Sequence, residues 1–264
     1  MVRMGATMRK RAWVVGCAIL FAGLRMAGAQ KLSADEIVTR MMQHDTERRA
    51  ALAEYQSERT YQMDYKGPIG ERHAQMRVRM EFSAPDKKSF TVVSESGSTI
   101  FCHQILRKLM EGEQEGALEV NRLRSMLSPQ NYHLRLAGED RLDGADAWVL
   151  DVSPKDDNRF NYKGQVWVNK TDYAVMRIVG SPAKNPNFLM GSSSFDYRYS
   201  RSGEFWLPER NDTVSHLRIG GQIKLTVDYG PYQILAADPL GGVTSAANRS
   251  NDIGVKGLAV SLPQ

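Results

Sequence analysis

The sequence has only two cysteines among its 264 residues, Cys17 and Cys102. Cys17 lies in an N-terminal segment that we expect to be removed, so the remaining chain cannot form an internal disulfide. The fold must therefore rely on a hydrophobic core, and a chain of this length can bury one. We interpret Cys102, in the context TIFCHQIL, as a small buried residue rather than a nucleophile.

The familiar motifs of catalysis and phosphate binding are also missing from the sequence. It contains no G-x-S-x-G, H-E-x-x-H or C-x-x-C pattern and no glycine-rich phosphate loop. The five histidines are scattered, and none has a neighbour at metal-ligand spacing. Asp156 and Asp157 lack the remaining oxygen ligands of a calcium loop, so we interpret them as part of a solvated turn. We therefore expect no enzyme activity, no cofactor and no metal.

From Gln30 onward, the chain has no excess of charge of either sign. The formal net charge is +5, but five basic residues lie within residues 1–29, which hold no acidic residue. Removing those five from the 35 basic residues leaves 30, against 30 acidic ones. Nucleic-acid-binding proteins carry a basic surface, so we expect no nucleic-acid partner.

Residues 1–29 have the order of a secretory signal peptide. A cationic RKR at residues 9–11 precedes the apolar run AWVVGCAILFAGL, and AGA at residues 27–29 forms a small-x-small cleavage site. The run is shorter than the roughly 20 residues that a transmembrane helix needs. We predict export and cleavage after Ala29. In the alternative interpretation VVGC is a lipobox with Cys17 lipidated, which we disfavour because most of the apolar run would then follow the cysteine.

The mature chain is predicted to open with a helix. Ser33 and Glu36 form a capping box, in which a hydroxyl and a carboxylate bind free amide groups at the helix start. An apolar stripe follows, as in a helix that lies on a core. The stripe contains Ile37, Val38, Met41 and Met42, then Leu52 and Tyr55, and is interrupted by His44, Asp45, Arg48 and Arg49.

Strands are predicted for most of the remaining sequence, because apolar and polar residues alternate there. The apolar sets are Met76, Val78, Met80 and Phe82; Tyr61, Met63 and Tyr65; Trp148, Leu150 and Val152; Phe195, Tyr197 and Tyr199; and Ile223, Leu225 and Val227. This alternation indicates an antiparallel sheet with one buried face, since parallel sheets covered on both sides show continuous apolar runs. Turns are predicted at residues 143–144, 153–154, 169–172, 201–203 and 220–221.

A second helical region is predicted over roughly residues 103–127, between the strands. Its apolar stripe is interrupted by EGEQEG, where Gly112 and Gly116 each cost a helix interior about 1 kcal/mol relative to alanine. Two interpretations stay open. The segment is either a solvated turn between two short helices or the hinge of a movable lid.

One proline-stiffened loop, SPAKNPNFLMG, presents three consecutive apolar residues. Pro182 and Pro186 exclude it from a central strand, and Phe188, Leu189 and Met190 follow. Three adjacent side chains cannot all face one side of a strand. Either two of them begin the core of the next strand, or the three line a cavity mouth or touch a membrane or a partner.

The segment VWVNKTDYAVMRIVG, residues 166–180, predicts two strands about a turn and carries a family resemblance. Its order of strand, Trp-Val-Asn, turn and Val-x-Arg resembles the outer-membrane lipoprotein-sorting proteins, the LolA-like superfamily that includes LolB and RseB. The similar layout covers roughly residues 32–232. It implies an α+β fold over residues 30–236, an antiparallel unclosed half β-barrel wrapped around a few helices that form a lid. Residues 237–264 are polar and glycine-rich, and we expect a flexible tail.

The resemblance further implies a periplasmic protein that shields acyl chains of lipids or lipoproteins in an apolar cavity and touches membranes transiently. An acyl chain of about 16 carbons costs on the order of 12 kcal/mol when drawn into water, so a carrier must replace that burial. The candidate cavity residues are Tyr61, Met63, Met76, Met80, Phe82, Trp148, Leu150, Met176, Tyr197 and Leu225. Phe188, Leu189 and Met190 are candidates for the mouth or a partner contact, and Gly112 and Gly116 for the lid hinge.

An alternative function stays open beside the carrier. In it the protein is an RseB-like sensor that recognises lipidic or misfolded envelope components and acts through an envelope protein partner. The methionines among the candidates suit a cavity that accepts chains of varied shape, and they equally suit a packed core.

Overall fold

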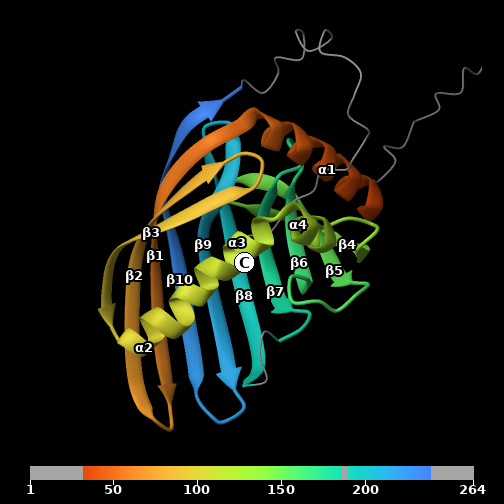
Figure 1. The fold of residues 1–264 in the computed structure, drawn as a ribbon. Coiled ribbons are helices and arrows are strands. Elements are labelled where there is room, and N and C mark those ends of the chain that lie inside the picture. The colour runs from red at the N-terminus through yellow and green to blue at the C-terminus, as the bar shows by residue number, and fades with distance from the viewer. Residues whose placement is uncertain (1–31, 186–188, 239–264) are drawn as a thin grey trace, which may run out of the picture. The chain divides into compact units, whose positions relative to one another are not determined.

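The computed structural model describes residues 32–185 and 189–238, which contain one ten-stranded antiparallel sheet and the helices on it (Figure 1). The strands are β1 (Leu52–Gly67), β2 (Gly70–Ser83), β3 (Lys87–Gly97), β4 (Tyr132–Leu142), β5 (Ala145–Pro154), β6 (Tyr162–Asn169), β7 (Val175–Pro182), β8 (Met190–Ser202), β9 (Phe205–Leu217) and β10 (Gln222–Ala237). The helices are α1 (Ala34–Ala51), α2 (Thr99–Phe101), η1 (Cys102–Leu106), α3 (Arg107–Ala117) and α4 (Glu119–Ser125). The predicted signal peptide, Phe188 and nearly all of the predicted tail lie outside the described residues.

The sheet is unclosed, as the predicted half-barrel requires. Its strand order is β3-β2-β1-β10-β9-β8-β7-β6-β5-β4, which leaves β3 and β4 at the two edges. Within the described residues, only the β1–β10 pairing joins strands distant in sequence, and it brings the first and last described strands to the interior of the sheet. The predicted fold class is confirmed.

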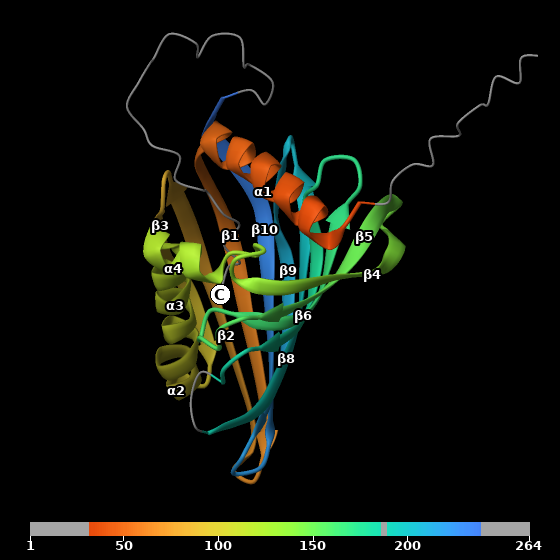
Figure 2. The same ribbon diagram turned by 90° about the vertical axis from the view of Figure 1, so that its right-hand side faces the viewer.

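The strand register builds one continuous inner face. A row of directly paired residues crosses nine strands: Met76, Tyr61, Val227, Asn211, Tyr197, Ile178, Val166, Leu150 and Leu136. All but Asn211 are apolar, so this row confirms the inward-facing side chains that the alternation in the sequence predicts. Helix α1 covers one half of this face and the segment from α2 to α4 covers the other (Figures 1 and 2).

Helix α1 begins where the sequence predicts and ends earlier. The Glu36 amide donates to Ser33 Oγ at 3.2 Å, and the Ser33 amide donates to Glu36 Oε2 at 2.7 Å, which confirms the capping box. The helix ends at Ala51, so the predicted extension of its stripe to Leu52 and Tyr55 is wrong. Both residues belong to β1: Tyr55 pairs with β2 and β10, while Leu52 pairs with β10 and its amide donates to the Arg48 carbonyl oxygen.

The second helical region runs through the glycines rather than breaking at them. From Thr99 to Ala117 the backbone stays helical, and the break falls at Leu118, whose ψ of 135° is extended. The interpretation of EGEQEG as a turn between two short helices is therefore wrong. Packing explains the difference, because Met110, Glu113 and Gly116 are buried on the sheet-facing side of α3, and such burial outweighs the small penalty of a glycine.

A smaller cluster lies on the opposite, outer face of the sheet. Ala147, Val149, Trp167 and Met176 pack together there. The β6–β7 pairing shifts register between Trp167 and Val168, so a bulge in β7 turns Met176 away from the inner face. The predicted place of Met176 in the inner cavity is therefore wrong.

Among the described residues, no helix has both the length and the apolar character needed to span a membrane.

Candidate functional site

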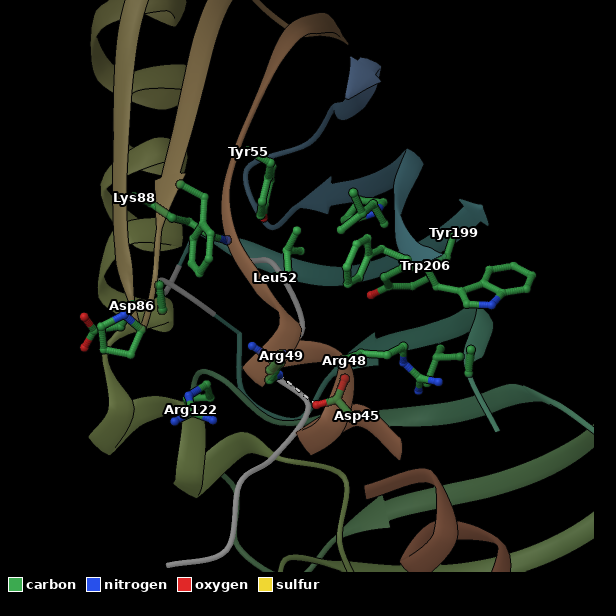
Figure 3. A pocket seen from close by; sticks show the side chains of 18 of the residues that line it. Asp45, Arg48, Arg49, Leu52, Tyr55, Asp86, Lys88, Arg122, Tyr199 and Trp206 are labelled. Atoms are coloured by element: carbon green, nitrogen blue, oxygen red, sulfur yellow. Dashed lines mark hydrogen bonds and ion pairs between the residues drawn. The ribbon is translucent and has the colours of Figure 1, made fainter. Parts of the chain in front are cut away.

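A cavity of about 160 Å³ lies on the inner face, where the start of β1 meets the C-terminal end of α1. Its walls also include parts of β2, β3, β8 and β9, the α3–α4 segment and the start of β7 (Figure 3). The apolar part of the wall is formed by Leu52, Tyr55, Phe82, Phe205 and Leu207. These residues also belong to or pack on the cluster between β1, β2 and β9, so the cavity is a gap in an otherwise filled core.

The same cavity is lined by more cations than anions. Five cationic side chains, Arg48, Arg49, Arg59, Lys88 and Arg122, face two carboxylates, Asp45 and Asp86. Arg48 and Arg49 lie in the last turn of α1, and Arg122 lies in the last turn of α4. Basic residues favour this position because the C-terminal end of the helix dipole is negative. In Figure 3, Arg49 of α1 lies between its partner Asp45 and Arg122 of α4.

Arg49 and Arg48 each have a hydrogen-bond partner, one within α1 and one in another element. Arg49 Nε donates to Asp45 Oδ2 at 2.7 Å within α1. Arg48 Nη1 donates to the Asp172 carbonyl oxygen at 2.9 Å, which ties the end of α1 to the β6–β7 turn. A carbonyl carries no net charge, so the charge of Arg48 is not neutralised by that hydrogen bond.

Arg59 has a carboxylate partner on the helix above it. Arg59 Nη1 donates to Glu113 Oε2 at 2.6 Å, and the Tyr61 hydroxyl donates to Glu113 Oε1 at 3.1 Å. The Arg59 guanidinium also lies 4.7 Å from the centroid of the Tyr229 ring. Burial by itself would lower the pKa of Arg59, but attraction to Glu113, reinforced by Tyr61, Tyr229 and Tyr232, raises that pKa well above its ordinary value.

Three of the five cations, Arg48, Lys88 and Arg122, lie in surroundings that disfavour their charged forms. Burial lowers the pKa of Arg48 and of Arg122, and it lowers the pKa of Lys88 to about 8. A group whose charged form is destabilised by burial gains most from a bound anion. The cavity can therefore hold a negatively charged group beside an apolar one.

Most predicted cavity residues are packed in the core of this structure. Tyr61, Met63, Met76 and Leu225 pack beneath α2–α3, while Trp148, Leu150 and Tyr197 pack beneath α1. Met80 belongs to the cluster beside the cavity, and Phe82 lines the cavity. Alternation identifies an inward side chain but not whether a helix fills the space above it. Ligand contact at these residues stays a prediction, as does the hinge role of Gly112 and Gly116.

The predicted mouth residues lie away from the cavity. Met190 pairs with Leu217, and the Arg218 amide donates to the Leu189 carbonyl oxygen at 2.8 Å, so both residues sit at the β9–β10 hairpin. The cavity contacts the other end of the same strand pair, at Tyr199 and Phe205. Leu189 and Met190 therefore lie at the opposite end of β8 from this cavity, and their role at a cavity mouth or in a partner contact stays a prediction.

The charged part of the cavity is the feature that sequence reasoning missed. Arg48 and Arg49 did leave a signal, since two adjacent cations interrupt the apolar stripe of α1. Lys88 and Arg122 left none, because each is an ordinary basic residue in a polar context. Within residues 32–185 and 189–238, no three His, Cys, Asp or Glu side chains come together as a metal site would require.

An unclosed antiparallel half-barrel, with helices over its inner face and a small cavity between them, defines a binding module. The sequence profile of the MucB/RseB N-terminal domain matches residues 40–180, more than half of the chain. The chain therefore belongs to the MucB/RseB N-terminal domain family, whose fold is that of a periplasmic binding module. No curated protein matches the sequence.

Solved structures with a similar fold are distant. A LolA superfamily protein from Nitrosomonas europaea is 12% identical over 79% of this chain and 96% of its own, with a TM-score of 0.36. A putative outer membrane lipoprotein-sorting protein domain from Vibrio parahaemolyticus is 16% identical over 74% and 92%, with a TM-score of 0.40. In the complex of MucA and MucB from Pseudomonas aeruginosa, the matching chain is 11% identical over 77% and 99%, with a TM-score of 0.23.

Proposed function

We propose that this protein is a periplasmic carrier that shields the acyl chain of an anionic amphiphile on the inner face of its sheet. The observation that carries the proposal is the composition of the cavity, in which aromatic and aliphatic walls adjoin Arg48, Lys88 and Arg122. The apolar wall suits an acyl chain, and the excess of partly desolvated cations suits its anionic head group. No catalytic step is part of the proposal.

The size of the cavity implies that a ligand enters by displacing helices. A cavity of about 160 Å³ is close to that of an engineered cavity that accepts benzene, about 150 Å³, whereas pockets for larger ligands span roughly 300–1,000 Å³. We propose that the described conformation is the closed form. When a chain enters, α3 and α4 move off the sheet, and the chain takes their place over Tyr61, Met63 and Met76.

The contacts of α3 and α4 suit such a lid. The two helices are separated by the extended residue Leu118, and α3 contains Gly112 and Gly116, at which an added Cβ would meet nothing within 4 Å. Arg59 and Glu113 hold α3 closed. Ligand stabilises an open form only through better contacts there than in the closed one, and an anion near Arg59 would supply such a contact by replacing Glu113.

Uptake of fluorescent acyl probes tests the proposal. One probe carries an anionic head group and the other a neutral one on the same chain. We expect Lys88→Met with Arg122→Met to weaken binding of the anionic probe at least tenfold and binding of the neutral probe much less. Lys108→Met, at an exposed position of α3, is the matched control. Native mass spectrometry of protein purified from the periplasm should also detect retained lipid; a protein with neither retained lipid nor probe uptake is no carrier.

A second candidate is a sensor that acts through an envelope protein. The family match favours it, because MucB, which gives the family part of its name, forms a complex with MucA in a solved structure. In that case lipid binding would change affinity for a protein partner rather than lead to transfer. Movement of probe from the protein to acceptor vesicles favours the carrier, and a stable cross-linked partner without transfer favours the sensor.

A further inference from the structure

Two exposed isoleucines occupy adjacent hairpin turns at the end of β1 that lies away from the cavity. Ile69 is in the β1–β2 turn and is 65% exposed, and Ile219 is in the β9–β10 turn and is 68% exposed. The turns touch, since a Cβ added to Gly220 would lie 3.3 Å from the Pro68 ring. Figures 1 and 2 both show the two hairpins together at one end of the sheet.

A third segment extends this apolar surface. Leu189, which is 39% exposed, is held beside Ile219 by the hydrogen bond from the Arg218 amide to the Leu189 carbonyl oxygen. We call Pro68, Ile69, Leu189 and Ile219 the apolar tip. Turns favour Gly, Pro, Asn, Asp and Ser because of their backbone conformations, so neither turn needs isoleucine to form.

The charges around the apolar tip are mostly positive. Around these turns lie Lys66, Arg72, Arg218 and Lys224, against two carboxylates, Glu71 and Asp64, the latter directly opposite Lys224 in the β1–β10 pairing. Glu71 pairs with Lys66 at 2.9 Å, and all four cations are exposed. The chain from Gln30 onward has equal numbers of acidic and basic residues, so this surface departs from the average of the molecule.

We infer that the apolar tip and its cations form a docking surface for an anionic lipid bilayer. Apolar side chains at the centre enter the boundary between head groups and acyl chains, while long basic side chains around them reach anionic head groups. The tip lies at the end of β1 near Gly67, whereas Leu52 and Tyr55 at its start line the cavity. The surface therefore positions the protein on a membrane and is separate from the cavity, so it does not depend on the proposed function.

Vesicle flotation of the exported protein tests this inference. We expect binding to vesicles of 70% phosphatidylcholine and 30% phosphatidylglycerol, and at least tenfold weaker binding to pure phosphatidylcholine or at 0.5 M salt, because surface charges are then screened. Ile69→Ser with Ile219→Ser should weaken binding at least tenfold. Leu235→Ser removes another exposed apolar side chain, 59% exposed, at the other end of β10 and should leave binding unchanged.

A second measurement locates the contact directly. Ile69→Cys, labelled with an environment-sensitive dye, should shift its emission to the blue when the anionic vesicles are added, and Leu235→Cys with the same label should not. The native Cys102 is buried, so labelling is selective. Equal flotation of the serine variant and the unmodified protein, binding indifferent to lipid charge, or no binding at all would each overturn the inference. Acyl-probe uptake, measured without vesicles, should be unchanged in the tip variants, so failure here is distinct from failure of the proposed function.

Discussion

Arg59 Nη1 lies 2.6 Å from Glu113 Oε2, in an ion pair whose side chains are 1% and 3% exposed. One residue belongs to the central strand β1 and the other to helix α3, so the pair links the sheet to the proposed lid. A buried charge is costly unless it is paired. Opening the lid would separate the two charges, and water or a ligand would have to replace the partner of each.

The ion pair is expected to couple lid closure to stability. Glu113→Gln leaves the Arg59 charge uncompensated and should lower the free energy of unfolding by about 3–5 kcal/mol. The double variant Arg59→Met with Glu113→Leu should recover most of that loss, because an apolar pair leaves no charge buried. Urea unfolding measures both. If the double variant is as unstable as the single one, the pair stabilises the fold by shape rather than by charge.

Binding of an anionic ligand should depend on pH through Lys88. Burial lowers the pKa of Lys88 to about 8 in the empty cavity, and a bound anion would raise that pKa by favouring the charged amine. Binding then takes up a proton, so affinity should fall as pH rises above about 8, by at most tenfold per pH unit. An acyl sulfonate probe, ionised throughout, should show this fall. Lys88→Met should remove it and Lys184→Met, at an exposed position, should keep it; a flat profile in the unmodified protein contradicts the assignment.

Substitutions on the two faces of β2 should differ strongly in their effect on the free energy of unfolding. Met80 is fully buried and Arg79 is exposed. Met80→Asp places an unpaired charge in the core and should cost at least about 3 kcal/mol of unfolding free energy, whereas Arg79→Ala should change it by less than about 0.5 kcal/mol. Thermal unfolding compares the two. Similar effects on both faces would mean that the register of β2 is different.

The glycines of α3 should trade stability against motion. An added Cβ at Gly112 or Gly116 would meet nothing within 4 Å, so each change to alanine should stabilise the helix by about 1 kcal/mol. If the glycines serve as a hinge, the double variant should also take up an acyl probe more slowly in stopped-flow fluorescence. Unchanged uptake with raised stability would assign the hinge to Leu118 instead.

The mature protein should begin at Gln30. The AGA site at residues 27–29 predicts this cleavage, and intact mass spectrometry of the exported protein measures it. A lipidated mature N-terminus at Cys17 would instead support the lipobox interpretation.

Local pattern was enough to predict the strands, their inward side chains and the start of α1. The alternation around Met76 and Met80, the Ser33–Glu36 capping box and the hairpin about Asn169 depend on residues close in sequence, so the sequence by itself determined them. Where packing competed with local preference, the prediction failed. Helix α3 continues through its glycines, and a register shift turns Met176 outward.

Only the tertiary structure decided what lies above the inner face and what surrounds the cavity. Apolar alternation has the same form under a packed helix and over an open cavity, so it could not distinguish a core methionine from a ligand contact. Arg49, Lys88 and Arg122 come from α1, β3 and α4, which the packing of the helices on the sheet brings together. The long-range pairing of β1 with β10 brings the turn that holds Ile69 against the turn that holds Ile219, although these residues are 150 positions apart in the sequence.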